Sequence, residues 1–263
     1  MYLPDERRAC ILRLLEERGS LRTASLAREL CVTDESIRND FICLERQGLL
    51  ERFHGGARHV MPGIFRNVGG ETRLGVLLAR RIVPLLPPRA ALFLEESRQA
   101  FAVIAELART SCTIVSNSPR ILGALSAPCV APECVSTGGR FDKEAGIYAG
   151  EAALRAALAA RPDCLVLSPE SFSPERGCGY GHLSRARMMR ELARAIPMVF
   201  LICPASRFVA AAPFETGALP IHTLATEDGI PQEAVQTLRS QGVRLELIPS
   251  LSPEDLREMR EQF

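Results

Sequence analysis

The spacing of apolar positions divides the chain into two parts with different periodicities. Over residues 4–46, apolar side chains recur every three or four positions, which predicts short amphipathic helices. Ile37, Phe41 and Leu44, for example, fall on one helical face. Beyond residue 71, short apolar runs alternate with amphipathic stretches, which predicts strands that alternate with helices.

The first part predicts three helices. The first is expected to run from Pro4 to about Arg18 and to end at Gly19. Residues 20–23 are a short extended link, in which Thr23 is a candidate cap of the second helix. Thr33 is expected to cap the third helix, whose first turn carries acidic residues that suit the helix dipole. Two of these helices joined by a tight turn form a helix-turn-helix.

A two-stranded wing is predicted after Gly48, with strands at 49–52 and 53–56 closed by turn glycines. The resulting winged helix-turn-helix predicts double-stranded DNA as a partner, because its exposed side chains include types that contact base edges and phosphates. The predicted DNA-binding residues are Arg22, Thr33, Ser36, Arg38, Asn39, Arg52, His54 and Arg58. A small helical bundle without a DNA-binding role is the alternative interpretation, since helix-turn-helix geometry is common.

Three motifs within residues 3–57 are more specific than this geometry: VTDESIRND, LERQGLLER and the closing HGGA. Together they resemble the N-terminal domain of the DeoR-type family of bacterial transcription regulators. That family usually has a second arginine where this chain has Asn39. Because asparagine pairs well with adenine, the departure implies a different operator preference or a weaker grip on phosphate.

The second part predicts a Rossmann-like, mainly parallel α/β domain whose sheet is covered on both faces. The expected strands are 91–95, 112–116, 129–136, 163–168, 198–203, 221–225 and 243–248. The expected helices are 71–84, 98–109, 118–125, 151–160, 183–195, 231–240 and 252–262. An irregular loop is expected after residue 168. We therefore predict a winged helix-turn-helix domain at 1–58, a linker at 59–70 and an effector and oligomerisation domain at 71–263.

Ligands of open α/β sheets bind beyond the carboxyl ends of the strands, and four such ends carry hydroxyl, amide, carboxylate or guanidinium groups. The candidate effector-binding residues there are Glu95, Ser97, Arg98, Asn117, Ser118, Gly138, Gly139, Arg140, Ser206 and Arg207. These groups favour a small phosphorylated metabolite. Purely structural roles are the alternative: Gly138 and Gly139 as turn residues, Asn117 as a helix N-cap, and Ser206 with Arg207 as caps of the next segment.

The order of these elements, with the SNS and TGGR turns, resembles the C-terminal sensor domain of the same family, which is similar to sugar-phosphate isomerases such as ribose-5-phosphate isomerase. The resemblance implies a sugar-phosphate effector. Two stretches depart from the family pattern: EESRQ stands in place of an Asp-x-Gly-x-Thr phosphate loop, and PASRF in place of Asp-x-Ser-Lys-Phe. Without the loop glycine the backbone cannot easily curl around a phosphate. An altered anionic effector and a domain that binds nothing both fit this pattern.

Composition narrows the function classes. The net charge is +1, and residues 1–60 contain ten arginines and ten acidic residues, so DNA binding must depend on where the charges lie. Nine cysteines without a CxxC pair favour reduced thiols in the cytoplasm over disulfides. We expect neither a bound metal nor a cofactor. We expect no signal peptide and no membrane segment, since no apolar run approaches ~18 residues.

The leading hypothesis is a non-enzymatic repressor of a metabolic operon that responds to a small phosphorylated sugar or related anion. It should form a homo-oligomer, a dimer or tetramer, because one such module buries too little DNA surface for specific binding. One alternative keeps the DNA-binding module but makes the larger domain only an oligomerisation scaffold. A second is a sugar-phosphate isomerase fused to a helix-turn-helix, with Glu95 or Glu96 as the base.

Overall fold

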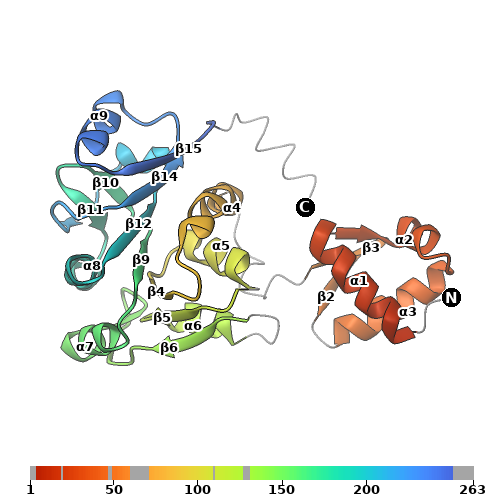
Figure 1. Cartoon of the computed structure of the whole chain (residues 1–263). Coiled ribbons are helices and arrows are strands. Elements are labelled where there is room, and N and C mark those ends of the chain that lie inside the picture. The colour runs from red at the N-terminus through yellow and green to blue at the C-terminus, as the bar shows by residue number, and fades with distance from the viewer. Residues whose placement is uncertain are drawn as a thin grey trace. The chain divides into compact units, whose positions relative to one another are not determined.

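The computed structural model describes residues 4–18, 20–46, 49–59, 71–108, 110–126 and 131–250. The chain divides into two compact units, whose described parts are residues 4–59 and 71–250 (Figure 1). The predicted linker beyond residue 59, the predicted terminal helix at 252–262, Gly19 and Gly48 lie outside the described residues.

The first unit is a winged helix-turn-helix. Its elements are α1 (Pro4–Arg18), β1 (Ser20–Arg22), α2 (Thr23–Glu29), α3 (Asp34–Arg46), β2 (Leu50–Phe53) and β3 (Gly56–His59). The strands form an antiparallel sheet in the order β1-β3-β2, so the predicted extended link is the third strand of the wing. One face of each helix is buried in a single core that includes Ile11, Leu26, Ile37 and Phe41.

Two details of the predicted first unit were wrong. The wing strands lie at 50–53 and 56–59, because Gly55 takes φ 83° and makes the tight turn between Phe53 and Gly56. Thr23 is the first residue of α2 and does not cap it: the cap position is Arg22, without a side-chain bond. The backbone N–H of Thr23 donates to the carbonyl of Gly55 at 2.9 Å, which ties the start of α2 to the wing turn.

The second unit is built on a seven-stranded parallel sheet. Its helices are α4 (Glu71–Ile82), α5 (Arg98–Leu107), α6 (Pro119–Leu125), α7 (Glu151–Ala159), α8 (Leu183–Ala195) and α9 (Gln232–Ser240), with short 3-10 turns η2 (Val83–Leu85) and η3 (Ala205–Phe208). The sheet strands are β4 (Ala91–Leu94), β5 (Thr113–Ser116), β6 (Glu133–Ser136), β9 (Cys164–Leu167), β12 (Met198–Ile202), β14 (Thr223–Glu227) and β15 (Arg244–Ile248).

The strand order is β15-β14-β12-β9-β4-β5-β6, and every neighbouring pair is parallel. Helices α4, α5 and α6 lie on one face of the sheet and α7, α8 and α9 on the other (Figure 1). This confirms the predicted α/β class with both faces covered. The chain runs outward from β4 through β5 to β6, then returns to place β9 on the other side of β4. The carboxyl ends of β4 and β9 therefore form the topological switch point of the sheet.

Several short strands were not predicted. The expected irregular loop after residue 168 is a hairpin of β10 (Ser171–Ser173) and β11 (Gly177–Tyr180), and β13 (Phe214–Glu215) pairs with β11. A second hairpin joins β7 (Arg140–Asp142) and β8 (Ile147–Ala149). The strand expected at 221–225 lies at 223–227, because its register is set by pairing with β12 and β15. Within the described ranges, no helix has the length and apolar character needed to cross a membrane.

Candidate functional site

The outer face of α3 carries the predicted base-contacting residues. Arg38 and Asn39 are exposed, while Ile37 and Phe41 on the opposite face are almost completely buried. Thr33 caps the helix as predicted, since its Oγ1 accepts the backbone N–H of Ser36 at 3.2 Å. The hydroxyls of Thr33 and Ser36 also lie 2.9 Å apart. The amphipathic pattern of α3 thus leaves a long forked donor and an amide on its open face.

A buried carboxylate fixes α3 against α1. Asp40 is 1% exposed, and its two oxygens accept bonds from the Nε atoms of Arg7 and Arg8. Because the carboxylate takes charged donors from two residues of α1, it ties α3 to α1 through two strong hydrogen bonds. Sequence reasoning did not identify this contact, since Asp40 lies more than 30 positions from both arginines.

The wing brings Arg22 and His54 together. The guanidinium of Arg22 lies over the ring of Phe53, 5.1 Å from its centroid, and its Nη1 donates to the carbonyl of His54 at 3.4 Å. Gly56 permits this close packing: a Cβ there would lie 2.3 Å from the carbonyl oxygen of Leu21. Both Arg22 and His54 are exposed, so both are open to a bound duplex.

The two other predicted arginines are ion-paired within the first unit. Arg52 Nε donates to Glu45 at 2.8 Å, and Arg58 Nη2 lies 3.2 Å from Glu51. Each side chain is still about two-fifths exposed, at 42% and 43%. A phosphate contact by either arginine would therefore compete with a carboxylate.

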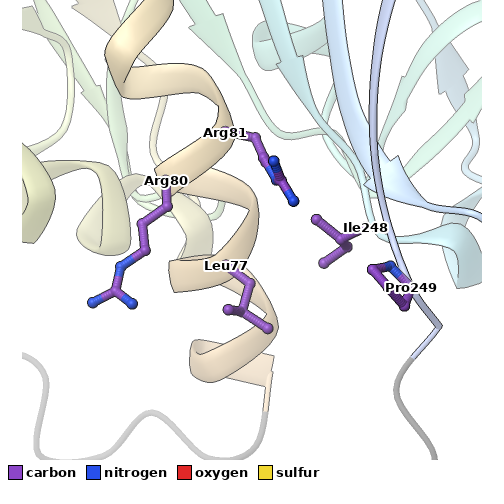
Figure 2. A pocket seen from close by; sticks show the side chains of 5 residues that line it. All are labelled: Leu77, Arg80, Arg81, Ile248 and Pro249. Carbon is purple, nitrogen blue, oxygen red and sulfur yellow. The ribbon is translucent and has the colours of Figure 1, made fainter.

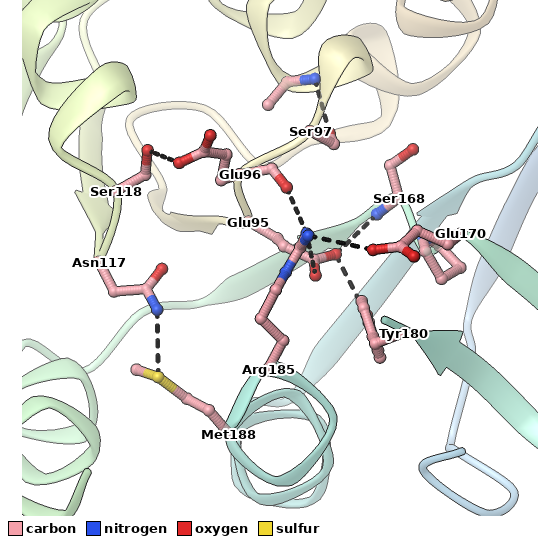
Figure 3. A network of polar contacts seen from close by, with 12 residues as sticks. Glu95, Glu96, Ser97, Asn117, Ser118, Ser168, Glu170, Tyr180, Arg185 and Met188 are labelled. Carbon is pink, nitrogen blue, oxygen red and sulfur yellow. Dashed lines mark hydrogen bonds and ion pairs between the residues drawn. The ribbon is translucent and has the colours of Figure 1, made fainter. Parts of the chain in front are cut away.

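At the switch point of the second unit, three elements converge on Glu95, which follows β4 (Figure 3). Its carboxylate accepts the backbone N–H of Ser168 at 3.0 Å, the hydroxyl of Tyr180 at 3.2 Å and Nη2 of Arg185 at 3.2 Å. Glu95 is 2% exposed. Burial raises the pKa of Glu95, and Arg185, Ser168 and Tyr180 act in the opposite direction by favouring the carboxylate. Burial likewise raises the pKa of Tyr180 well above its ordinary value, and the charge of Glu95 raises it further.

Glu96 connects the same region to α6. Its carboxylate accepts the hydroxyl of Ser118 and Nη1 of Arg120, the latter at 2.8 Å. The hydroxyl of Ser118 also caps α6 by accepting the N–H of Ile121 at 3.2 Å, and Ser97 caps α5 in the same way through Ala100. Ser97 and Ser118, two of the three predicted effector-binding serines, are therefore already engaged within the protein.

Asn117 is not a helix N-cap, because Ser118 holds that position. Asn117 is 1% exposed, and its amide donates to the carbonyl of Tyr148 at 3.0 Å and contacts the sulfur of Met188 at 3.2 Å. Its side-chain oxygen has no hydrogen-bond partner among the described residues. Leaving a buried acceptor unpaired is costly, so this oxygen is a group that would gain from a hydroxyl donor.

The predicted glycine turn follows β6, at the edge of the sheet. Gly138 and Gly139 have positive φ angles of 55° and 106°. A Cβ on Gly139 would lie 2.9 Å from that of Ala153, so this glycine is required for packing against α7. Arg140 and Arg98 are exposed. β6 is separated from the switch point by β5 and β4, so the structure does not bring this turn into the cluster around Glu95.

Arg207 extends from η3 toward the end of β9. Its Nη1 donates to the hydroxyl of Ser168 at 3.1 Å and to the carbonyl of Pro169, and its Nη2 donates to the side-chain oxygen of Gln99 at 3.3 Å. Ser206 is exposed. The guanidinium of Arg207 is thus engaged by neutral acceptors and does not cap the following segment.

Sequence reasoning missed four residues of this cluster: Gln99, Ser168, Tyr180 and Arg185. Ser168 could have been found, because it ends a predicted strand that the carboxyl-end rule covers. Arg185 gives no such signal, since it lies on α8 and reaches Glu95 from 90 positions along the chain.

A separate pocket lies between α4 and the end of β15, with a volume of about 380 Å³ (Figure 2). It is lined by Leu77, Arg80, Arg81, Ile248 and Pro249. None of the predicted effector-binding residues contributes to it.

A winged helix-turn-helix with an open recognition helix, joined in one chain to a parallel α/β domain, defines the class of two-domain DNA-binding transcription regulators. Residues 7–62 match the DeoR-like helix-turn-helix domain, and residues 76–228 match the DeoR C terminal sensor domain. The chain belongs to the DeoR family of transcription regulators.

Curated relatives agree with this family. A putative aga operon transcriptional repressor from Escherichia coli O157:H7 is 25% identical over 254 residues, which cover 93% of this chain and 94% of that protein. A putative galactitol utilization operon repressor from Escherichia coli K12 is 40% identical over 58 residues, 22% of this chain and 52% of that protein. Among solved structures, ribose 5 phosphate isomerase A from Neisseria gonorrhoeae aligns with a TM-score of 0.38 at 14% identity, over 53% of this chain and 54% of that one.

Proposed function

We propose that this protein represses an operon of carbohydrate metabolism and that its C-terminal domain responds to a small phosphorylated sugar or related anion. The main support for the DNA-binding function is the outer face of α3. Arg38 and Asn39 are exposed there, while the buried carboxylate of Asp40 ties the helix to α1. The named functions of the relatives, repression of aga and galactitol operons, support the metabolic assignment.

In this proposal seven of the eight predicted DNA-binding residues divide into two groups, and the eighth, Thr33, caps α3. Arg38, Asn39 and Ser36 contact base edges, since arginine pairs with guanine and asparagine with adenine. Arg22 and His54 approach the backbone from the wing, and Arg52 and Arg58 contribute to the extent that a phosphate displaces their carboxylate partners. Two copies of the chain bind together, because repeated half-sites need two recognition helices.

We do not propose isomerase activity. A general base must reach a substrate proton, and the carboxylate of Glu95 is enclosed by Ser168, Tyr180 and Arg185. Glu96 is likewise bound by Ser118 and Arg120. The same enclosure favours one other candidate function, a regulator whose C-terminal domain serves only in oligomerisation.

Selection of bound duplexes from a random pool tests the proposal with the full-length chain. We expect enrichment of a short sequence repeated at a fixed spacing, which gives the operator and shows that two recognition helices act together. Recovery of unenriched duplexes, or of none, would contradict the proposed function.

A further inference from the structure

The donors around Glu95 have the arrangement of an anion-binding site. A backbone N–H at the end of β9, a hydroxyl from β11 and a guanidinium from α8 point at one carboxylate (Figure 3). We call Ser168, Tyr180 and Arg185 the donor cluster. Charge-assisted donors that converge from separate elements are the usual means of holding a carboxylate or phosphate. Here the anion that they hold is a side chain of the same chain.

Three buried polar atoms, two of them in or next to the donor cluster and one on Asn117, which contacts Met188 of α8, have no partner among the described residues. Two are donors, Nε of Arg185 and Nε2 of Gln99, and one is an acceptor, Oδ1 of Asn117. Gln99 and Asn117 are each 1% exposed. The side-chain oxygen of Gln99 accepts the hydroxyl of Ser168 at 3.0 Å, which places its amide next to the donor cluster.

This set of unpaired atoms is chemically specific. Two free N–H groups need acceptor oxygens, and one free carbonyl oxygen needs a hydroxyl donor. A phosphorylated polyol supplies both kinds of group, whereas inorganic phosphate at neutral pH supplies mainly acceptors.

We propose that the donor cluster is the anion-binding site of the C-terminal domain, and that the Glu95 carboxylate is an internal anion which the phosphate of the effector replaces. This inference rests on the proposed function and assigns its effector site. Arg185, which follows no predicted strand, becomes the principal phosphate ligand. Because the free protein must first release Glu95, the apparent affinity for the effector is reduced by the fraction of molecules in which the site is open.

Inorganic phosphate is a suitable probe, titrated against the full-length chain at constant ionic strength, with chloride as the balancing anion. Calorimetry gives the dissociation constant. We expect weak binding to the parent and binding about tenfold tighter to Glu95→Gln, since the variant leaves Arg185 without its internal anion. Arg185→Gln should abolish binding in both backgrounds. Arg155→Gln is the matched control, because Arg155 on α7 is 74% exposed and its ion-pair partner among the described residues is Glu151 of its own helix.

A second variant covers the case in which Glu95→Gln does not fold. Glu170 is half-exposed and lies 3.4 Å from Nη1 of Arg185, so Glu170→Gln removes competition for the same guanidinium without opening the core. It should tighten phosphate binding by about threefold.

The phosphate titrations test the anion-binding site, and they do so independently of the proposed DNA-binding function. Folded Glu95→Gln with parent-like phosphate affinity, or binding that survives Arg185→Gln, would overturn the inference. If Glu95→Gln does not fold, unchanged affinity in Glu170→Gln would do the same. Failure of the parent to select an operator would instead contradict the proposed function, whatever the phosphate titration gives.

Discussion

Cys31 lies in the turn between α2 and α3 with a φ of 53°, in the left-handed region. A side chain there costs about 1–2 kcal/mol, whereas glycine adopts the conformation freely but gains about 0.4–1 kcal/mol of entropy in the unfolded chain. We therefore expect Cys31→Gly to raise the free energy of unfolding of the first unit by about 0.5–1 kcal/mol, measured by urea denaturation with circular dichroism. Cys31→Ala keeps the Cβ and should show no such gain. If Cys31→Gly is less stable than the parent while Cys31→Ala is unchanged, the backbone at residue 31 is not strained.

Glu95 makes the stability of the second unit depend on pH. Its pKa is raised above the ordinary value of 4.5, so the native state binds this proton more tightly than the unfolded state. The resulting contribution to stability is fully present below pH 4.5 and is lost as the pH rises through the native pKa.

Denaturation of the parent and Glu95→Gln over a pH series isolates this contribution. The free energy of unfolding of the parent, minus that of the variant, should fall as the pH rises above 4.5 and then level off. A difference that grows with pH would mean that the attraction of Arg185 outweighs burial.

Among the elements, α3 is the one whose orientation matters most for DNA, and Asp40 sets it. Asp40→Asn keeps the shape of the side chain but removes the charge that Arg7 and Arg8 share. We expect a loss of about 2–4 kcal/mol in the free energy of unfolding of the first unit, because the carboxylate is buried but Arg8 is partly exposed.

Asp34→Asn is the matched control for this prediction. Asp34 lies in the first turn of the same helix and is exposed, so its substitution should cost only about 0.3–1 kcal/mol through the helix dipole. Equal losses in the two variants, again followed by urea denaturation, would show that the buried ion pairs do not anchor α3.

The main elements could be predicted from the sequence because their signals are local. β9 and β12 are buried almost continuously, which gives unbroken apolar runs, and α8 was predicted with its observed bounds. β11 and β13 were missed because they are short and are defined by pairing between distant residues, such as Gly179 with Glu215. A local pattern cannot show a pairing between residues so far apart.

The candidate site was predictable only in part, for a related reason. The carboxyl-end rule directs attention to Glu95 after β4, but it cannot give the strand order that sets β9 beside β4. Without that order, the residues that follow β6 and β12 are candidates for the binding site as good as those at the switch point. Arg185 comes from a helix on one face of the sheet, and its role follows only from the folded chain.

In the whole molecule, charge alone does not explain DNA binding. The net charge is +1, and Arg52 and Arg58 are ion-paired with acidic side chains. We therefore expect few contacts with phosphates, the groups that supply most sequence-independent affinity, for each copy. We expect base contacts by α3 to carry an unusually large share of the binding free energy, with two copies acting together.

The most direct test of this account compares the affinity of the parent and Arg38→Ala for the selected operator and for a scrambled duplex of equal length. Arg38→Ala should lower the ratio of the two affinities by about 5- to 150-fold, as expected for one arginine–base contact worth ~1–3 kcal/mol. Arg155→Ala, which changes an exposed arginine of α7, should leave the ratio unchanged. A parent-like ratio in Arg38→Ala would contradict the assignment of α3 as the helix that contacts the operator bases.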